Sequence, residues 1–117
     1  MNKQTPTIQI YPDKIGEWRF RFLCAKGESR LRASEGYNAK VNAYKGIDSV
    51  IRNMDEDKRL DFKTNSRGKH FFTIKARNGN ILAMSRNHLE LESLESDLAV
   101  IREQLRSAET VELNKND

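Results

Sequence analysis

Hydrophobic and polar positions alternate along three short segments near the start of the chain. Trp18, Phe20 and Phe22 are separated by charged residues, which is the period-two pattern of a strand with one buried face. Residues 8–11 before this segment and residues 30–33 after it show the same alternation, with turn-forming residues between the segments. The pattern therefore predicts three strands joined by hairpins.

Two segments further along carry the period of an amphipathic helix. In the first, Asn38 is the expected N-cap, and Gly46 is expected where the helix approaches the sheet closely. Its predicted apolar stripe comprises Val41, Tyr44, Ile47, Ile51 and Met54. Asn87 is the expected cap of the second helix, and a last short strand is expected at 110–113. The second stripe comprises Leu91, Leu94, Leu98, Ile101 and Leu105.

The pattern of strands followed by a helix occurs twice. An offset of 52 residues places Phe20 on Phe72 and Gly27 on Gly79, and an offset of 51 aligns the two helical stripes. Few residues are identical, but the order of turn glycines, strand apolars and helix apolars is shared. Because a repeated unit determines the whole architecture, we interpret the chain as a duplication. The Asn78-Gly79 pair in the second half predicts a type I′ hairpin turn.

A unit of about 50 residues buries too little apolar surface to be stable by itself. Two copies that share a sheet or a helix layer would remove this difficulty. We therefore expect one cooperative domain, with the first repeat at residues 8–58 and the second at residues 59–113. Residues 1–7 and 114–117 are expected to be flexible tails.

One motif of the first half is specific enough to suggest a family. It begins with Ser34-Glu-Gly-Tyr37, and the hairpin Asp13–Arg21 precedes it. Its further positions are Lys40, Ala43, Gly46-Ile47, Ser49-Val50 and Asn53. With these residues the chain resembles the YegP-like family of small, tandemly repeated bacterial proteins of uncharacterised function. The second half departs from the motif at Arg86, Asn87, His88, Leu91 and Asp97.

The resemblance implies an α+β fold in which two β-strand–helix–strand repeats form one antiparallel sheet. The helices would pack on one face and a pseudo-twofold axis would relate the repeats. It also implies that each repeat contributes its last strand to the other half, so that residues 59–64 end one repeat and begin the next. The family carries no accepted enzyme activity, cofactor or catalytic residue, so the resemblance implies none here.

Residues that could support catalysis or metal binding are few and scattered. Cys24 lies on the apolar side of its strand and is interpreted as a core residue. His70 and His88 lack the spacing of a metal site, and the glycines form no phosphate-binding loop. We therefore predict no catalytic residue, no cofactor and no metal, and classify the protein as a non-enzyme. The longest apolar runs have four residues, which excludes a membrane span, and a single cysteine is typical of the reducing cytoplasm.

Charge is distributed unevenly along the chain. Residues 1–57 carry a net charge of +2, residues 58–86 carry +7 and residues 87–117 carry −5. On the polar side of the first three strands, arginines are expected to converge beside a tyrosine, which predicts weak nucleic-acid binding through this face of the sheet. The residues of this predicted site are Tyr11, Arg19, Arg21, Arg30 and Arg32. The simpler alternative is that these side chains form only the solvated face of a one-sided sheet.

Two apolar side chains fall on the polar side of the second set of strands. Phe71 and Ile81 would form an exposed apolar patch if they lay together, and such a patch often marks an interface. The second hypothesis is therefore a protein–protein interaction or homodimerisation module that uses this face. Taken together, the sequence predicts a small accessory binding protein of the cytoplasm, a monomer or weak homodimer, whose partner is a nucleic acid or a protein.

Overall fold

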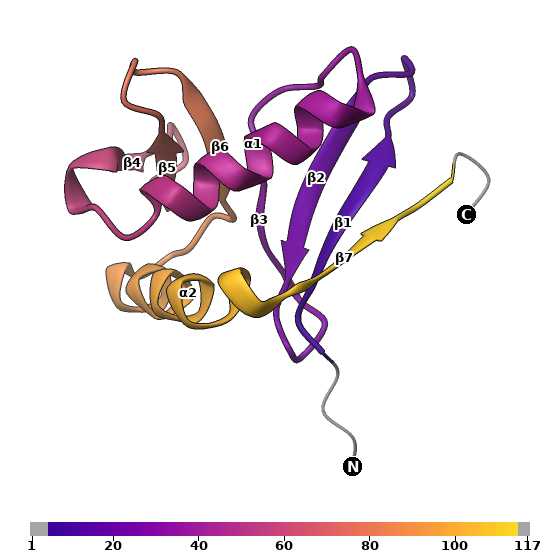
Figure 1. The fold of residues 1–117 in the computed structure, drawn as a ribbon. Helices are drawn as coiled ribbons and strands as arrows, with labels where there is room; N and C mark the ends of the chain where they lie inside the picture. The colour runs from indigo at the N-terminus through magenta and orange to yellow at the C-terminus, as the bar shows by residue number, and fades with distance from the viewer. Residues whose placement is uncertain (1–4, 115–117) are drawn as a thin grey trace.

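The computed structural model describes residues 5–114, which form a seven-stranded sheet and two helices (Figure 1). The strands are β1 (Thr7–Pro12), β2 (Trp18–Leu23), β3 (Ser29–Ala33), β4 (Leu60–Thr64), β5 (His70–Lys75), β6 (Ile81–Ser85) and β7 (Glu109–Glu112). The helices are α1 (Lys40–Asn53) and α2 (Leu91–Gln104), followed by the short 3₁₀ turns η1 (Asp57–Arg59) and η2 (Leu105–Ser107). No helix among residues 5–114 is long and apolar enough to cross a membrane.

The ends of the chain differ in how far they are described. Residues 1–4 and 115–117, which belong to the two predicted tails, lie outside the described residues. Within the described part, Thr7 already belongs to β1, where it lies opposite Leu23 and Glu109.

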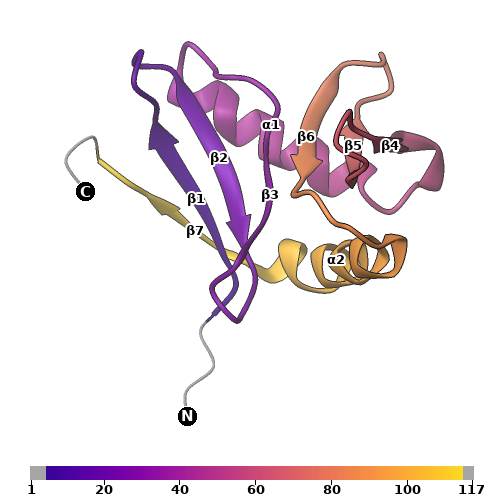
Figure 2. The ribbon, with the colours of Figure 1, turned by 180° about the vertical axis from the view of Figure 1, so that it is seen from behind.

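The sheet has the strand order β4-β5-β6-β3-β2-β1-β7. Its centre is the antiparallel β3–β6 pair, and outward from this pair β2 and β1 follow on one side and β5 and β4 on the other. The fold is α+β as predicted, but the sheet is mixed, because β7 runs parallel to β1. The parallel strands β1 and β7 are far apart in sequence, and the chain reaches β7 from β6 through α2. Both helices lie on one face of the sheet, and no helix of residues 5–114 lies on the opposite face (Figures 1 and 2).

A glycine in the left-handed region closes each of the four hairpins. The four glycines are Gly16, Gly27, Gly68 and Gly79, with φ between 78° and 90°. The type I′ turn predicted at Asn78-Gly79 is wrong, because that turn needs positive φ at both central residues and no described residue other than glycine has it. Instead, the side chain of Asn78 accepts a hydrogen bond from the amide of Asn80 at 2.9 Å, which stabilises the turn locally.

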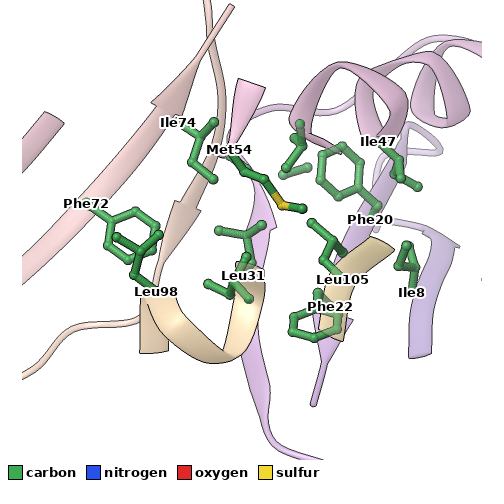
Figure 3. Packing of buried hydrophobic residues seen from close by; sticks show 14 of the residues in the cluster. Ile8, Phe20, Phe22, Leu31, Ile47, Met54, Phe72, Ile74, Leu98 and Leu105 are labelled. Atoms are coloured by element: carbon green, nitrogen blue, oxygen red, sulfur yellow. The ribbon is translucent and has the colours of Figure 1, made fainter. Parts of the chain in front are cut away.

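The core lies between the sheet and the helices and is continuous across both halves (Figure 3). Phe22 and Leu31 from the first half pack in the same buried cluster as Phe72 from the second. The helices contribute Met54 and Ile101, both fully buried. Each large apolar side chain buried in this way contributes roughly 1.5–3 kcal/mol, and both halves contribute such side chains to this one cluster.

Both helices begin later than the caps predicted from the sequence. In the first half, Trp18 and Tyr37 exchange two backbone hydrogen bonds of 2.7 and 2.8 Å, which hold the segment after β3 in extended form. As a result α1 starts at Lys40, with Ala39 rather than Asn38 at the N-cap and no side-chain cap. The predicted stripe is displaced too: Val41 is exposed, whereas Ala43, Val50 and other small residues are buried.

Gly46 marks the point of closest approach between α1 and the sheet. A Cβ atom at this position would lie 2.5 Å from the hydroxyl of Tyr37 and 3.2 Å from a ring carbon of Phe20. The two rings are themselves stacked, with centroids 6.3 Å apart, so they cannot both move aside. The expectation of a close contact at Gly46 is confirmed.

We expect Gly46→Ala to destabilise the protein, although alanine favours a helix by about 1 kcal/mol. The steric overlap with Tyr37 should outweigh that gain and lower the free energy of unfolding by about 1–3 kcal/mol, as overpacking does elsewhere. Urea unfolding of the variant measures the change. In the double variant Gly46→Ala/Tyr37→Phe the nearest atom is gone, so part of the stability should return. An unchanged or higher stability of the single variant would contradict this packing.

Candidate functional site

A single transverse row of side chains crosses the helix-free face of the sheet. On the five inner strands the neighbours of these residues in sequence are buried toward the helices, so the row itself points to the opposite side. The register places its members directly opposite one another across all seven strands. This outer row comprises Asp61, Thr73, Met84, Arg32, Arg21, Gln9 and Val111.

Two arginines lie side by side in the middle of the outer row. Arg21 on β2 is directly opposite Arg32 on β3. Arg21 donates a 2.6 Å hydrogen bond to the side-chain oxygen of Gln9, and its guanidinium carbon lies 4.6 Å from the ring centroid of Tyr11. Arg32 donates to the sulfur of Met84 at 3.4 Å. Within residues 5–114 neither arginine forms an ion pair with an acidic side chain, so both charges remain uncompensated.

Arg19 belongs to the same group and lies near the start of β2. It lies opposite Tyr11 and forms an ion pair with Asp13 at 2.9 Å. The hydrogen bond from Arg19 lowers the pKa of Asp13, which keeps this carboxylate ionised and Arg19 neutralised. Four of the five residues of the predicted site, Tyr11, Arg19, Arg21 and Arg32, therefore come together on one face.

The fifth residue, Arg30, lies on the other side of the sheet, and its predicted place beside the other arginines is wrong. The register shifts at this point, because Leu31 and Ser29 are opposite consecutive residues of β2 and Arg30 is left over. Such a bulge turns the extra side chain out of the regular alternation. Arg30 consequently reaches α2, where it donates to Asp97, and it also pairs with Glu28 at 2.7 Å.

Asp97 is the centre of an ion cluster that the sequence did not predict. Its carboxylate is fully buried and accepts hydrogen bonds from Arg30, from Arg86 at 2.9 Å and from His88 at 2.5 Å. Burial raises the pKa of Asp97, but the hydrogen bonds from Arg86, His88 and Arg30 outweigh it, so that the net shift is downward. Three of the residues at which the second half departs from the family motif therefore form one compensated group.

The Asp97 cluster lies at an open pocket of about 470 Å³ beside the first turns of α2. The carboxylate is ionised and is already engaged by three donors, so it is neither a free base nor an available metal ligand. The Asp97 carboxylate has a structural role, because its hydrogen bonds hold α2 against the bulge of β3 and against the segment that follows β6. A buried charge needs such partners, and a helical sequence pattern does not show that a charged position is buried.

The remaining residues considered for chemistry lie apart from one another. Cys24 is 3% exposed in the core, as predicted. Burial raises the pKa of the Cys24 thiol. Hydrogen bonds with the backbone of Glu28 and with the side chain of Arg30 lower it by more, so the net shift is downward. His70 contacts the hydroxyl of Thr64 at 3.1 Å. No group of three or more His, Cys, Asp or Glu side chains in the described part of the chain is arranged to hold a metal ion.

Phe71 and Ile81 do not form the patch expected from the sequence. Phe71 lies opposite Lys63 near the start of β5, whereas Ile81 lies opposite Lys75 at its end. Four residues of strand separate the two positions, which corresponds to about 13 Å. The sequence reasoning also missed an exposed aromatic residue at the edge of the sheet, Phe62, which is 48% exposed.

These features define a class of protein: a small α+β protein with two helices on one face of a seven-stranded mixed sheet. A family described as "Domain of unknown function (DUF1508)" matches residues 13–61. The UPF0339 protein in the ptx operon 5′ region of Stutzerimonas stutzeri is 33% identical over 107 residues, covering 92% of this chain and 96% of that protein. The chain belongs to the UPF0339 family.

Two further relatives match this chain over different lengths. The solution NMR structure of YegP from Escherichia coli, a protein of unknown function, matches over the full length of both chains with a TM-score of 0.88 and 26% identity. The UPF0339 protein Atu0232 of Agrobacterium fabrum is 45% identical over 57 residues, which is 90% of that protein but 49% of this chain. The resemblance to YegP is confirmed. The names of these relatives state no activity, substrate or partner.

We expect Asp97→Asn to destabilise the protein strongly, because it leaves two arginines facing a neutral amide. Breaking a buried ion pair on one side costs about 3 kcal/mol or more, and chemical denaturation at neutral pH measures the loss. The exposed Asp61→Asn serves as the control and should change stability by less than about 1 kcal/mol. Equal stability of Asp97→Asn and the wild type would contradict the structural role of the cluster.

The same cluster predicts a pH dependence of stability. Because the pKa of Asp97 is lower in the folded protein than in the unfolded chain, the unfolded chain takes up the proton first as the pH falls. The contribution of Asp97 is thus complete above an unfolded pKa of about 4 and is lost at lower pH. Asp97→Asn should lack this component, so its stability should fall less steeply in acid than that of the wild type.

Proposed function

We propose that this protein is a small, non-enzymatic accessory protein of the cytoplasm that binds nucleic acid weakly through the helix-free face of its sheet. The site consists of Arg21 and Arg32 at its centre, with Arg19 and Tyr11 beside them. One observation carries the proposal: Arg21 and Arg32 are cross-strand neighbours without an acidic partner among residues 5–114.

Two like charges directly opposite each other destabilise a sheet. Several other arginines of this protein have an acidic partner, as Arg19 has in Asp13 and Arg30 has in Asp97. Only an external anion would neutralise the pair formed by Arg21 and Arg32, and the phosphates of a nucleic acid present closely spaced negative charges. The guanidinium group also matches phosphate geometry, since it donates two parallel hydrogen bonds.

The distribution of charge between the two faces favours the same surface. Among the members of the outer row, Arg21 and Arg32 are cationic and Asp61 is anionic, and Asp61 is paired with Lys75 at 3.3 Å. The exposed acidic residues of α2, including Glu92 and Glu95, lie on the layer of helices. A polyanion would therefore be attracted to the arginines of the face without helices and repelled by the acidic surface of α2. Phosphate contacts of this kind carry little sequence information, so we expect weak and sequence-tolerant binding.

We also infer that the two halves are tandem copies of one unit related by an approximate twofold axis between β3 and β6. The strand order supports it, because the same succession of strands leads outward from the centre on both sides. The isolated bridges Trp18–Tyr37 and His70–His88 occur at matching positions. The relative Atu0232, which matches about half of this chain over most of its own length, is consistent with a single unit.

Replacing both central arginines should abolish most of the binding. We expect Arg21→Ala/Arg32→Ala to weaken the affinity for a short fluorescent DNA duplex, measured by fluorescence anisotropy over a range of salt concentrations. The slope of log K against log salt should become shallower by about 2, because each lost phosphate contact contributes about 0.9.

The matched control removes the same charge from a different place. Arg67 and Arg77 lie in the two hairpin turns of the second half, so Arg67→Ala/Arg77→Ala tests net charge without touching the outer row. This control should keep the affinity and salt slope of the wild type. Absence of wild-type binding at low salt, or equal weakening by both double variants, would disprove the proposed site.

Relief of the repulsion also predicts a gain in stability. Arg32→Gln should raise the melting temperature by about 2–4 °C, the equivalent of roughly 0.5 kcal/mol in a domain of this size. Arg19→Gln is the control and should lower it, because it leaves Asp13 without its partner. A melting temperature of Arg32→Gln at or below that of the wild type would mean that the arginine pair is not under strain.

A further inference from the structure

The two edges of the sheet differ in a way that the nucleic-acid proposal does not explain. On one edge, β7 pairs with β1 along four residues and the helix-facing Ile10 of β1 is fully buried. On the other edge, β4 has β5 on one side and no strand of residues 5–114 on the other. Its helix-facing residue Phe62, which the offset of 52 matches to Ile10, is 48% exposed.

From this edge we infer that β4 is a self-association strand, which pairs antiparallel with β4 of a second copy of the chain. The first support for this pairing comes from the directions of the backbone hydrogen-bonding groups. The amide of Phe72 donates to the hydroxyl of Ser85 on β6 at 2.9 Å, so the peptide groups of Phe72 face away from β4. Phe62 lies opposite Phe72, and in an antiparallel pair of this kind its own N–H and C=O point away from β5. They face outward, ready to bond another strand.

The sequence of β4 is complementary to itself about Phe62. The strand reads Leu60-Asp-Phe-Lys-Thr64. A twofold axis through Phe62 places each Asp61 opposite Lys63 of the second copy, which creates two oppositely charged cross-strand pairs. Such self-complementarity is what a symmetric dimer requires. Lys63 forms no ion pair with any residue among 5–114, so its charge is available.

The same axis brings the two exposed phenylalanines together. Phe62 already packs against Phe72 with ring centroids 5.7 Å apart, and the second Phe62 would extend this contact on the helix side of the sheet. A strand that paired parallel to β4, as β7 pairs with β1, would fit this edge less well. Glu112 of β7 is held by Lys40 and Tyr44 of α1, whereas the matching positions of α2 are Leu91 and Glu95, which donate neither bond.

The expected assembly is a continuous sheet of fourteen strands, formed by two seven-stranded sheets. Five residues of ladder and one aromatic pair form a small contact. Interfaces below about 1,200 Å² are typically weak and transient, so the dimer should form only at high protein concentration. The helix-free face continues across the junction, where each outer row ends at Asp61, opposite Lys63 of the second copy.

Charge reversal tests both the dimer and its register, with sedimentation velocity as the measurement. Wild-type protein should shift reversibly from monomer toward dimer as its concentration rises. Asp61→Lys alone and Lys63→Asp alone each create like-charge pairs and should weaken self-association about tenfold or more. An equimolar mixture of the two variants restores opposite charges at both positions and should associate as the wild type does. Asp48→Lys, which changes an exposed charge on α1, should leave association intact.

Three results would overturn the inference: a wild-type chain that stays monomeric up to its solubility limit, single reversals that associate normally, or a mixture that fails to restore the dimer. Asp61 also pairs with Lys75 in the monomer, so its reversal could disturb folding. Hydrogen exchange of the wild-type Phe62 amide provides a second measurement without any mutation. This amide should exchange fast in dilute solution and become protected as the concentration increases, and concentration-independent exchange would count against the dimer.

Discussion

The pairing of β3 with β6 is the interaction on which the rest of the molecule depends. It consists of three residue pairs, one of which brings Ala33 opposite Ala83. These small residues face the helices and leave room for Met54 and the apolar side chains of α2 to meet in one core. Without this junction there would be a three-stranded sheet (β4-β5-β6) and a four-stranded sheet (β3-β2-β1-β7), each with an uncovered apolar edge. Both bulges of the sheet flank the junction, one at Arg30 and one at Leu82, and each directs a side chain onto the layer of helices.

The elements of the fold could be predicted from the sequence because they depend on local patterns. Alternation identified the strands and their buried faces, and the offset of 52 residues predicted that three more strands and a helix follow in the second half, as they do. The bulge at Arg30 could not be predicted, since a register shift depends on a neighbouring strand and leaves no mark on the alternation of a five-residue segment. The late start of α1 has a similar cause, because the Trp18–Tyr37 bridge competes with the cap at Asn38.

The candidate sites could be predicted less well, because they depend on tertiary neighbours. The convergence of Arg21 with Arg32 followed from alternation and a hairpin, and it was anticipated. The absence of an acidic partner beside them depends on the folded surface, so it could not be predicted from the sequence. For Asp97, the sequence shows only an acidic residue on an acidic helix. That it is buried depends on Arg30, 67 residues away, and on residues beyond β6. Phe71 and Ile81 seemed adjacent because their strands are adjacent, but antiparallel pairing puts them at opposite ends.

The two bulges fit each half of the chain to the helix of the other half. Arg30 of the first half reaches Asp97 on the helix of the second, while Leu82 of the second half lies at a pocket with Gly46 on the helix of the first. Each half therefore supplies the bulge residue that suits the other half's helix and not its own. A chain built from two second halves would bury two aspartates against leucines, and one built from two first halves would point two arginines at glycines. Replacing either half by a copy of the other would therefore break both of these contacts.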